Sequence, residues 1–507
     1  MITNRFLNTG VLSTAKRGHF KISQLRLRVL SYLSFHLLPF LSWAILLGTL
    51  YPRILWDEYH YLIMNDGDTP LFISFARNIL NCPLNVSGGL FINAISSNCL
   101  PIVEGSQFTY YTDHPPASGW IMALFYALGA DSISEQRMVS VMATLVSSVV
   151  FWDLVAEYFD RKTANIAFIF VVSTPLFLFH SVVVHIHIWS LLFSLLTLKY
   201  FMSYLKHKTP TSRNLFLCIY FLSLLIDWPN YILGLLILFI LVVKKEKLSA
   251  TLVAILSSIF YFCVRYWSYN FSGEGSNPAI SAALETANVL TSPPTMSHIM
   301  LILFYFVKSH FLVAIGLPIC FFLVFSRGYL GTEQSILLVL FLFQGILHIL
   351  LFTEWASSHI YWTLFLVFPT SLGLSLGLIQ ASQAFARKKF AVITAIVIAG
   401  LSLSYSYLWW VRDYISSPKP FQTYFAENEL ANLFSSDETL IWTDTDQVLS
   451  GAGFKLRLWV QQPIKQYQPG VNTGLLITKK ELSLKVDDSK IPYLDWFDWY
   501  LYRLEED

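Results

Sequence analysis

The sequence predicts a polytopic α-helical membrane protein with a small C-terminal domain outside the membrane. The first observation behind this prediction is composition. Of 507 residues, 55% are hydrophobic and only 13% are charged, and the mean hydropathy is +0.54. A soluble globular protein usually carries about 25% charged residues, so this chain has too much apolar surface for a water-soluble core. The second observation is the order of segments along the chain. Apolar runs of membrane length alternate with short basic segments.

The N-terminal segment, residues 1–28, is basic and is expected to lie in the cytoplasm. The first apolar run, 29–51, starts too late and is too long for a cleavable signal peptide. Positive charge is retained on the cytoplasmic side of a membrane, so the far end of this first helix is expected outside. The basic residues of the segment are Lys16, Arg17, Lys21, Arg26 and Arg28.

The later apolar runs predict about 11–13 membrane helices in a module that covers residues 29–411. The predicted helices cover residues 30–51, 116–130, 136–158, 164–180, 186–205, 214–227, 230–243, 248–270, 298–325, 335–353, 359–381 and 390–411. Basic clusters expected inside are Arg161-Lys162, Lys206 to Arg213, Lys244 to Lys247, Arg327 and Arg387 to Lys389. The segments 180–187, 227–230, 271–297 and 354–359 are then expected outside.

One stretch does not fit a simple alternation of sides. An odd number of crossings must separate an external residue 57 from an internal residue 161, but two apolar segments lie between them. The run 116–130 has only about 15 residues, which is short for a full crossing. Two alternatives follow: either this run is a partial helix, or Arg161-Lys162 is an exception to the charge rule.

Two regions are expected outside the membrane. Residues 53–115 form a long outer loop with one amphipathic piece, 71–80, of the kind that lies in a membrane interface. Residues 412–507 are less apolar and more charged, and the segments 439–443 and 454–460 have strand-like patterns. We therefore expect a small α/β domain at the C-terminus, on the periplasmic side.

The five cysteines fall into two groups. Cys218, Cys263 and Cys320 lie in apolar runs and are expected to be buried packing residues. Cys82 and Cys99 both lie in the outer loop. A disulfide between them fits an oxidising compartment, and two free thiols remain the alternative.

Two acidic positions flank the outer loop. Asp57-Glu58 follows the first apolar run, where a lipid headgroup meets water, and acids there suit acid/base chemistry on a lipid-borne substrate. Asp113-His114 precedes Pro115-Pro116, which fix the backbone before the next helix. If the loop folds back on itself, Asp57-Glu58 and Asp113-His114 are expected to lie close together. The alternative is that the first pair merely begins a loop and that Asp113 marks an ordinary helix N-terminus.

In these motifs the chain resembles the GT-C superfamily of membrane glycosyltransferases, in particular the bacterial branch akin to aminoarabinose and protein-mannosyl transferases. The resemblance extends over roughly residues 29–411, and its strength lies in the order of short motifs. Besides the two acidic segments, these motifs are Arg137 to Leu198, with Tyr158 to Ala164 and Thr174 to Phe179 inside it, and Trp355 to Trp362 followed by Pro369.

The resemblance implies that a sugar is moved from a polyprenyl-phosphate donor, with inversion, at the outer face of a membrane. Asp57 corresponds to the family's general base, with Glu58 beside it, and Asp113 corresponds to its second acid. His114 takes the position of a donor-phosphate contact. Many relatives carry an acid about a dozen residues after the Thr-Pro pair.

This chain has His180, His185 and His187 in that region instead. Three histidines suggest a metal, so a divalent metal cofactor is an open alternative. However, His185 and His187 would point to different sides of a helix. The metal ligands stay unassigned.

Charge stabilisation on a departing phosphate also requires cations or hydrogen-bond donors. Arg265, Lys308 and His359, with the neighbouring Tyr361, lie at or near predicted outer helix ends, and we predict that they bind substrate. For Arg265 and Lys308 the alternative is simple snorkelling to the headgroups.

The predicted partners are a polyprenyl-phosphate-linked sugar, a lipid, glycan or protein acceptor, and membrane lipids. The net charge of +2 predicts no nucleic-acid partner. The predicted location is a bacterial inner membrane, with the active site facing the periplasm. Two other classes remain open, a lipid or polysaccharide flippase and a non-catalytic membrane scaffold, although no paired halves typical of transporters are visible.

Overall fold

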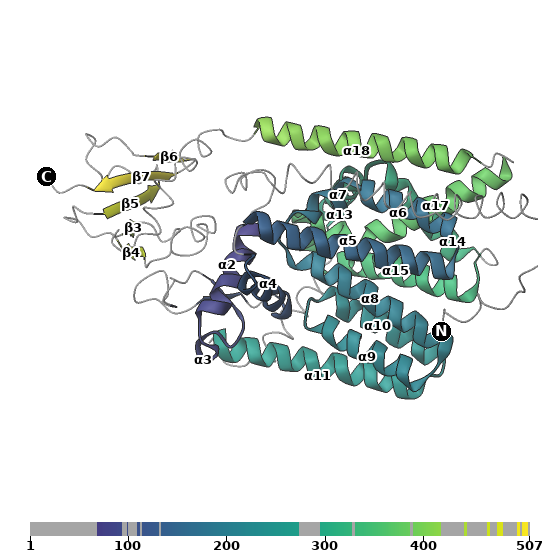
Figure 1. The fold of residues 1–507 in the computed structure, drawn as a ribbon, viewed down its shortest axis with the longest axis horizontal. Coiled ribbons are helices and arrows are strands. Elements are labelled where there is room, and N and C mark those ends of the chain that lie inside the picture. The colour runs from purple at the N-terminus through teal and green to yellow at the C-terminus, as the bar shows by residue number, and fades with distance from the viewer. Residues whose placement is uncertain are drawn as a thin grey trace, which may run out of the picture.

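The computed structural model describes most of the membrane module and five strands of the C-terminal region. The described residues are 68–93, 99, 109–111, 114–130, 133–272, 295–326, 330–385, 389–416, 441–443, 464–466, 474–479, 494–496 and 499–504. The predicted helix 30–51 and the predicted strand 454–460 lie outside these ranges. The described helices form one elongated bundle, with α11 along one edge and α18 along the opposite edge (Figure 1).

The helices agree closely with the apolar runs of the sequence. They are α2 (Asp68–Asn81), α3 (Leu84–Ser87), α4 (Ala117–Ala127), α5 (Ile133–Tyr158), α6 (Arg161–Ser173), α7 (Pro175–Ser181), α8 (Ile186–His207), α9 (Pro210–Leu224), α10 (Pro229–Val243), α11 (Lys247–Ser272), α13 (Met296–His310), α14 (Gly316–Phe325), α15 (Thr332–Leu351), α16 (Thr353–Ser358), α17 (Val367–Ala384) and α18 (Phe390–Ser416). Two 3₁₀ helices, η3 (Phe311–Ile315) and η4 (Ile360–Leu366), precede α14 and α17.

Within the described part, seven helices are long and apolar enough to cross a membrane, or eight if the bent pair α6–α7 is one span. Helices α4 and α10 are apolar but shorter. The expected polytopic helical fold is therefore confirmed.

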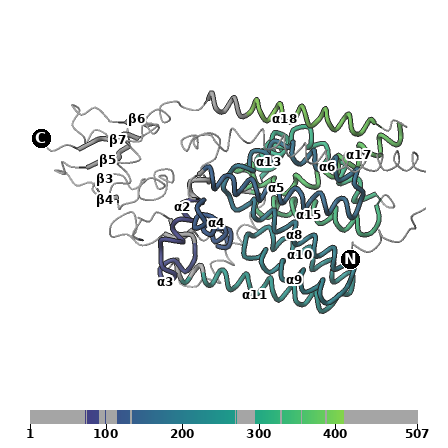
Figure 2. Tube along the Cα trace, viewed as in Figure 1, coloured from purple at the N-terminus to yellow at the C-terminus, as the bar shows by residue number. Residues whose placement is uncertain are grey.

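Short turns arrange α8 to α11 as successive antiparallel helices, which can be followed along the trace in Figure 2. The turn between α8 and α9 ends in a capping box, in which Thr209 Oγ1 accepts from the backbone N–H of Ser212, and Pro210 starts the helix. The turns α8–α9 and α10–α11 share one end of the bundle with the start of α6. Most of the predicted internal basic clusters lie there, and we call it the basic end.

Acidic side chains at the basic end pair with lysines. Lys206 Nζ lies 2.8 Å from Glu157, and Lys208 Nζ lies 2.8 Å from Glu246. Asp153, an acid within the apolar run of α5, lies 2.7 Å from Lys199.

A sharp bend separates α6 from α7. The two helices meet at 65°, and Pro175 begins the second one after the extended Thr174. Proline cannot donate the backbone hydrogen bond that would continue the first helix. The hydroxyl of Thr174 instead donates to the carbonyl oxygen of Phe170 at 2.7 Å. The bend turns α7 toward the loop 182–185 at the opposite end of the bundle, which we call the outer end.

The short run 116–130 forms a partial helix. Helix α4 has 11 residues, so it is about 16 Å long, roughly half of a hydrocarbon core. Its buried Met122 and Ala123 share a hydrophobic cluster with Phe72 and Phe75 of α2. Because α4 packs against α2 and is shorter than a full crossing, the first of the two alternatives left by the sequence is favoured.

Two glycines bring α14 and α17 into close contact. A Cβ on Gly316 would overlap the backbone carbonyl of Thr370, and a Cβ on Gly373 would overlap the carbonyl oxygen of Gly316. Small residues at a membrane-helix interface permit such an approach. Helix α17 belongs to a span that is 83% buried, the most enclosed of the candidate spans, so this contact lies in the core of the bundle.

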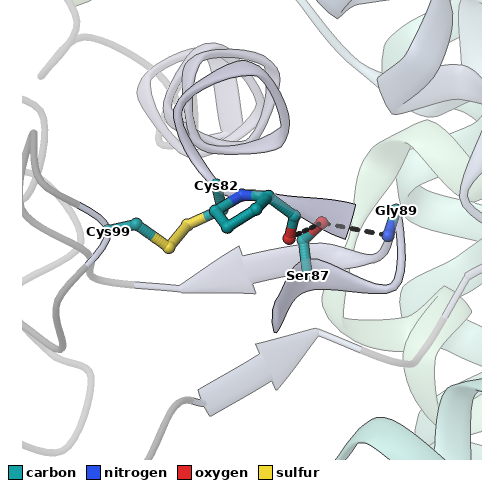
Figure 3. The surroundings of a disulfide bond; sticks show 5 residues. Cys82, Ser87, Gly89 and Cys99 are labelled. Carbon is teal, nitrogen blue, oxygen red and sulfur yellow. Dashed lines mark hydrogen bonds between the residues drawn. A yellow bond between two sulfur atoms is a disulfide. The ribbon is translucent and has the colours of Figure 1, made fainter. Parts of the chain in front are cut away.

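The outer loop is closed by a disulfide between Cys82, next to the end of α2, and Cys99 (Figure 3). The bridge was one of two alternatives for these cysteines, and the structure has it. Near Cys82 the chain turns at Gly88 and Gly89, both with positive φ, and the backbone N–H of Gly89 donates to Ser87 Oγ at 3.1 Å. Strands β1 (Phe91–Asn93) and β2 (Thr109–Tyr111) then pair antiparallel.

The loop is also fixed to the helices. The indole N–H of Trp120 in α4 donates to the carbonyl oxygen of Gly89 at 2.7 Å. The same indole packs against Trp267 of α11, with ring centroids 5.8 Å apart. These contacts hold the loop that leads to residue 114 against the bundle.

The free cysteines differ in part from the prediction. Cys320 is buried as expected, but Cys218 and Cys263 are exposed. They lie on outward faces of α9 and α11, where a membrane protein presents apolar side chains to lipid instead of to its own core. The prediction that these two thiols are buried was therefore wrong.

The C-terminal region contains a five-stranded mixed sheet with the order β4-β3-β5-β7-β6. Its strands are β3 (Ile441–Thr443), β4 (Ile464–Gln466), β5 (Gly474–Lys479), β6 (Leu494–Trp496) and β7 (Trp499–Leu504). Strand β3 pairs parallel with β4 and β5, whereas β7 pairs antiparallel with β5 and β6. The predicted strand 439–443 is confirmed as β3. The described residues after Ser416 include strands and no helix.

Candidate active site

Described residues of four predicted outer segments, 53–115, 180–187, 227–230 and 354–359, lie in or beside one cluster of histidines and aromatic rings. His114 comes from the loop before α4, and Asp227 comes from the turn between α9 and α10. The other members come from the α7–α8 connection, from the end of α15 and from the segment before α17. Six of the twelve histidines of the chain lie in this cluster, namely His114, His180, His185, His187, His348 and His359.

Asp227 is the only charged carboxylate that the described part of this cluster contains, and it binds two imidazoles. Its Oδ1 lies 2.8 Å from Nδ1 of His114, and its Oδ2 lies 3.1 Å from Nδ1 of His187. Its Oδ1 also accepts from the backbone N–H of Trp228 at 2.8 Å. The Asp227 side chain has no exposed surface, whereas that of His114 is 15% exposed.

These contacts fix the protonation of the carboxylate and the tautomers of both rings. Burial raises the pKa of Asp227, but the charge and hydrogen bonds of His114 and His187 outweigh burial and hold its pKa well below the usual range. An ionised carboxylate can only accept hydrogen bonds, so both rings carry a proton on Nδ1. Each ring then presents Nε2 away from Asp227.

His185 and His187 face each other, contrary to the prediction. His185 is not helical: it has an extended backbone and forms the N-cap of α8, where its Nδ1 accepts from the backbone N–H of His187 at 3.1 Å. Helical spacing therefore does not apply to the pair. The two ring centroids lie 4.4 Å apart at 74°.

Tyr361 lies at the centre of the cluster. Its ring centroid is 4.9 Å from those of His185 and His187, 5.1 Å from that of His359 and 5.7 Å from that of His180. Tyr361 and His359 are partly exposed, whereas His180, His185 and His187 are buried. The tyrosine thus separates the buried rings from the exposed part of the cluster.

The buried part of the cluster contains ring nitrogens without hydrogen-bond partners among the described residues. They are Nε2 of His187, Nδ1 of His348 and the indole Nε1 of Trp362. A buried polar group that loses its partner costs about 1–3 kcal/mol. We define these three rings as the nitrogen triad.

Two cations flank the cluster on aromatic rings. The guanidinium carbon of Arg265 in α11 lies 5.4 Å from the ring centre of Trp228, the residue next to Asp227. Nζ of Lys308 in α13 lies 4.8 Å from the ring centre of Trp409 in α18. Trp409 stacks on Phe179, which contacts His180. Each cation therefore contacts a tryptophan ring, and that tryptophan in turn lies next to a residue of the cluster.

Of the predicted site residues, the structure brings together His114, His359 and Tyr361, with Arg265 and Lys308 at the edges. Asp57, Glu58 and Asp113 lie outside the described residues. The sequence prediction omitted Asp227, His348 and Trp362. A signal for Asp227 was available, because it is an acid in the apolar stretch 222–233 and lies in a segment that was itself predicted to be external.

The described residues include no group of three or more His, Cys, Asp or Glu side chains arranged to hold a metal ion. The donor atoms explain this result. The Nδ1 atoms of His114 and His187 face Asp227, and Nδ1 of His185 accepts a backbone N–H. These atoms are therefore already engaged in the protein's own hydrogen bonds.

Comparison with known proteins gives a match to one family model and to several solved structures. Residues 113–269 match the family model "Dolichyl-phosphate-mannose-protein mannosyltransferase". That segment begins one residue before His114 and contains His187, Asp227 and Arg265. No curated protein matches the chain.

Solved structures match over most of the chain. ArnT from Cupriavidus metallidurans bound to undecaprenyl phosphate matches with a TM-score of 0.61 at 11% identity, over 91% of this chain and 96% of that chain. The apo state of the same protein matches with a TM-score of 0.58 at 11% identity, over 91% and 97%.

An Archaeoglobus fulgidus oligosaccharyltransferase tethered to an acceptor peptide matches with a TM-score of 0.51 at 12% identity, over 89% of this chain and 70% of that chain. The chain therefore has the fold of the GT-C membrane glycosyltransferases. Its segment 113–269 resembles the dolichyl-phosphate-mannose-protein mannosyltransferases, and the resemblance predicted from the sequence is confirmed.

Proposed function

We propose that this protein is an integral membrane glycosyltransferase that moves a sugar from a polyprenyl-phosphate donor to an acceptor, with inversion. The observation that carries the proposal is the His114–Asp227 pair. It holds an imidazole, by a 2.8 Å contact with a buried carboxylate, at the outer end of a GT-C bundle. The neighbouring residue in the chain is Asp113, which corresponds to the second acid of the family motif.

The transfer needs stabilisation of a departing phosphate. His114 presents Nε2 away from Asp227, and a carboxylate on Nδ1 favours the protonated ring. Arg265 lies over the ring of Trp228, the residue next to Asp227. His114 and Arg265 are therefore proposed to contact the donor phosphate, with Lys308, His359 and Tyr361 as further substrate contacts.

The transfer also needs a base. We propose Asp57 as the general base on the acceptor hydroxyl, with Glu58 beside it and Asp113 as the second acid. A base that activates the acceptor on the face opposite the leaving phosphate gives inversion. The sugar is a hexose or a pentose.

The active site is proposed to face the periplasm of a bacterial inner membrane. Two observations support this orientation. The disulfide Cys82–Cys99 lies in the loop that leads to His114, and disulfides persist in oxidising compartments. The basic clusters of residues 206–213 and 244–247 lie at the opposite end of the bundle, as the positive-inside rule requires for a cytoplasmic end.

The substrates are proposed from the relatives. One solved ArnT structure holds undecaprenyl phosphate, and the archaeal oligosaccharyltransferase structure holds an acceptor peptide. We propose that this chain uses a polyprenyl-phosphate sugar in the same type of site and that its acceptor is a lipid, a glycan or a protein. The region 412–507, with its five-stranded sheet, is proposed as a periplasmic domain.

The test uses purified protein in nanodiscs with radiolabelled polyprenyl-phosphate sugars and envelope acceptors. We expect label to move to an acceptor, and Asp57→Asn to reduce the rate by at least 100-fold with unchanged lipid binding. The matched control is Asp153→Asn, which removes a paired acid at the basic end and is expected to leave the rate within twofold. Full activity in Asp57→Asn contradicts the base assignment. Movement of lipid between leaflets without sugar transfer supports a flippase instead.

A further inference from the structure

The nitrogen triad is a group of polar atoms with no role in the transfer proposed so far. His187 and His348 are each 1% exposed, and Trp362 is 8% exposed. The ring centroids lie 6.1 Å apart for His187 and His348, 6.0 Å apart for His187 and Trp362, and 4.5 Å apart for His348 and Trp362. Most buried polar groups in proteins have a partner. Three such nitrogens on neighbouring rings point to a partner that the described residues do not supply.

The chemistry of that partner follows from the three nitrogens. Asp227 holds the proton of His187 on Nδ1, and the burial of this ring, which is 1% exposed, disfavours its charged form. The Nε2 of the neutral ring can therefore only accept. The indole N–H of Trp362 can only donate. The partner must therefore donate and accept at once.

A hydroxyl group meets this requirement, because it has one donor hydrogen and two acceptor lone pairs. A phosphate oxygen lacks the hydrogen for His187, and an ammonium group lacks the lone pair for Trp362. A ring N–H of His348 donates to the backbone carbonyl of Trp362, so its Nδ1 is a second acceptor, which needs a second hydroxyl hydrogen. We propose that the nitrogen triad binds two hydroxyls of the sugar that the polyprenyl-phosphate donor carries. This inference rests on the proposed function, and it adds a sugar subsite to the phosphate contacts named above.

The position of the triad agrees with this role. His114 and His187 share Asp227, and their ring centroids lie 6.1 Å apart. His114 is the exposed ring of the two, and His187 is the buried one. A phosphate held at His114 therefore has the triad about one sugar ring farther into the protein. Tyr361 packs against His187 at 4.9 Å on the partly exposed side and can cover the sugar face.

An ordered water also donates and accepts hydrogen bonds. The two sources make different predictions for ligand affinity. A triad that holds only water contributes equally to the binding of polyprenyl phosphate with or without a sugar. A sugar subsite contributes only when the sugar is present.

The experiment measures the affinity of the full-length protein in nanodiscs for undecaprenyl phosphate and for the same lipid carrying glucose, galactose or mannose. Trp362→Phe removes the indole N–H and keeps an aromatic ring. We expect about tenfold weaker binding of the sugar lipid that the wild type prefers, as for the loss of one hydrogen bond to a neutral group. Binding of bare undecaprenyl phosphate is expected to change less than twofold.

The matched control is Trp152→Phe. Trp152 lies in α5, outside the cluster, and its indole N–H donates to Asn165 of α6 at 2.8 Å. This variant is expected to change neither the affinity for the sugar lipid nor that for bare undecaprenyl phosphate.

A second pair of variants tests the triad at His348. His348→Phe is expected to weaken sugar-lipid binding about tenfold, and His348→Asn is expected to restore most of it, because the amide oxygen occupies a place close to that of Nδ1.

The outcomes separate the two proposals. Loss of sugar-lipid affinity alone supports the subsite. Equal losses for both lipids in Trp362→Phe, or no loss for either, overturn the subsite and leave the proposed transfer in place if the wild type still moves label. A wild type that binds neither lipid overturns both proposals.

Discussion

Replacing Asp227 by alanine is predicted to be among the most damaging single changes in the bundle. The carboxylate is fully buried, and it accepts from His114, His187 and the backbone N–H of Trp228. Alanine removes all three acceptor contacts at once. The Nδ1–H of His187, whose side chain is 2% exposed, is then left without an acceptor.

The size of the expected loss of stability follows from the burial of Asp227 and its imidazole partners. Removing one partner of a buried ion pair costs about 3–5 kcal/mol, since the other partner is left uncompensated. Asp227→Asn keeps one acceptor oxygen, so we expect a smaller loss of about 1–3 kcal/mol. Glu157→Gln is the control. Its ion pair with Lys206 lies at the basic end with side chains 37% and 42% exposed, and we expect a loss of at most about 1 kcal/mol.

The assay is the free energy of unfolding in bicelles by steric trapping, repeated at pH 7 and pH 5. Because the folded-state pKa of Asp227 is lowered, its contribution to stability is complete above the unfolded-state pKa of about 3.9 and is lost only as the pH falls below that value toward the folded-state pKa. The deficit of Asp227→Ala should therefore persist at pH 5. A deficit below 1 kcal/mol at pH 7, or one that disappears by pH 5, would refute the assignment of a buried ionised carboxylate.

Two further predictions concern packing and orientation. Gly316→Ala should destabilise the protein by about 1–3 kcal/mol or more, because the new methyl group overlaps the carbonyl of Thr370. The control is Gly400→Ala, where nothing lies within 4 Å of the added Cβ, and it should be neutral or stabilising by up to about 1 kcal/mol. Thermal unfolding in detergent compares the two variants. Equal effects would contradict the close packing of α14 against α17. A membrane-impermeant maleimide on intact cells should label a cysteine placed at the exposed Asn85 but not one at the exposed Lys208, and the reverse result would invert the proposed topology.

The sequence alone determined where the helices lie. Apolar runs bounded by basic clusters predicted α5 to α18 closely, because in a membrane every backbone group must be paired inside the segment and the apolar length is set by the bilayer. The same reasoning noted that 116–130 is short for a full crossing, with an exception to the charge rule at Arg161-Lys162 as the alternative. It also predicted that residues 180–187, 227–230 and 354–359 share one side. Cys82 and Cys99 could be placed in one loop, but their bond could not be decided without the fold.

Only the tertiary structure decided the site. Asp227 is 113 residues from His114 and 40 from His187, and no local spacing predicts that one buried carboxylate binds both. Helical periodicity gave the wrong orientation for His185 and His187, because it cannot foresee that His185 ends a loop and caps a helix. Side-chain chemistry of this kind depends on which helix ends meet, and that is set by packing of the whole bundle, including the close contact at Gly316 and Gly373.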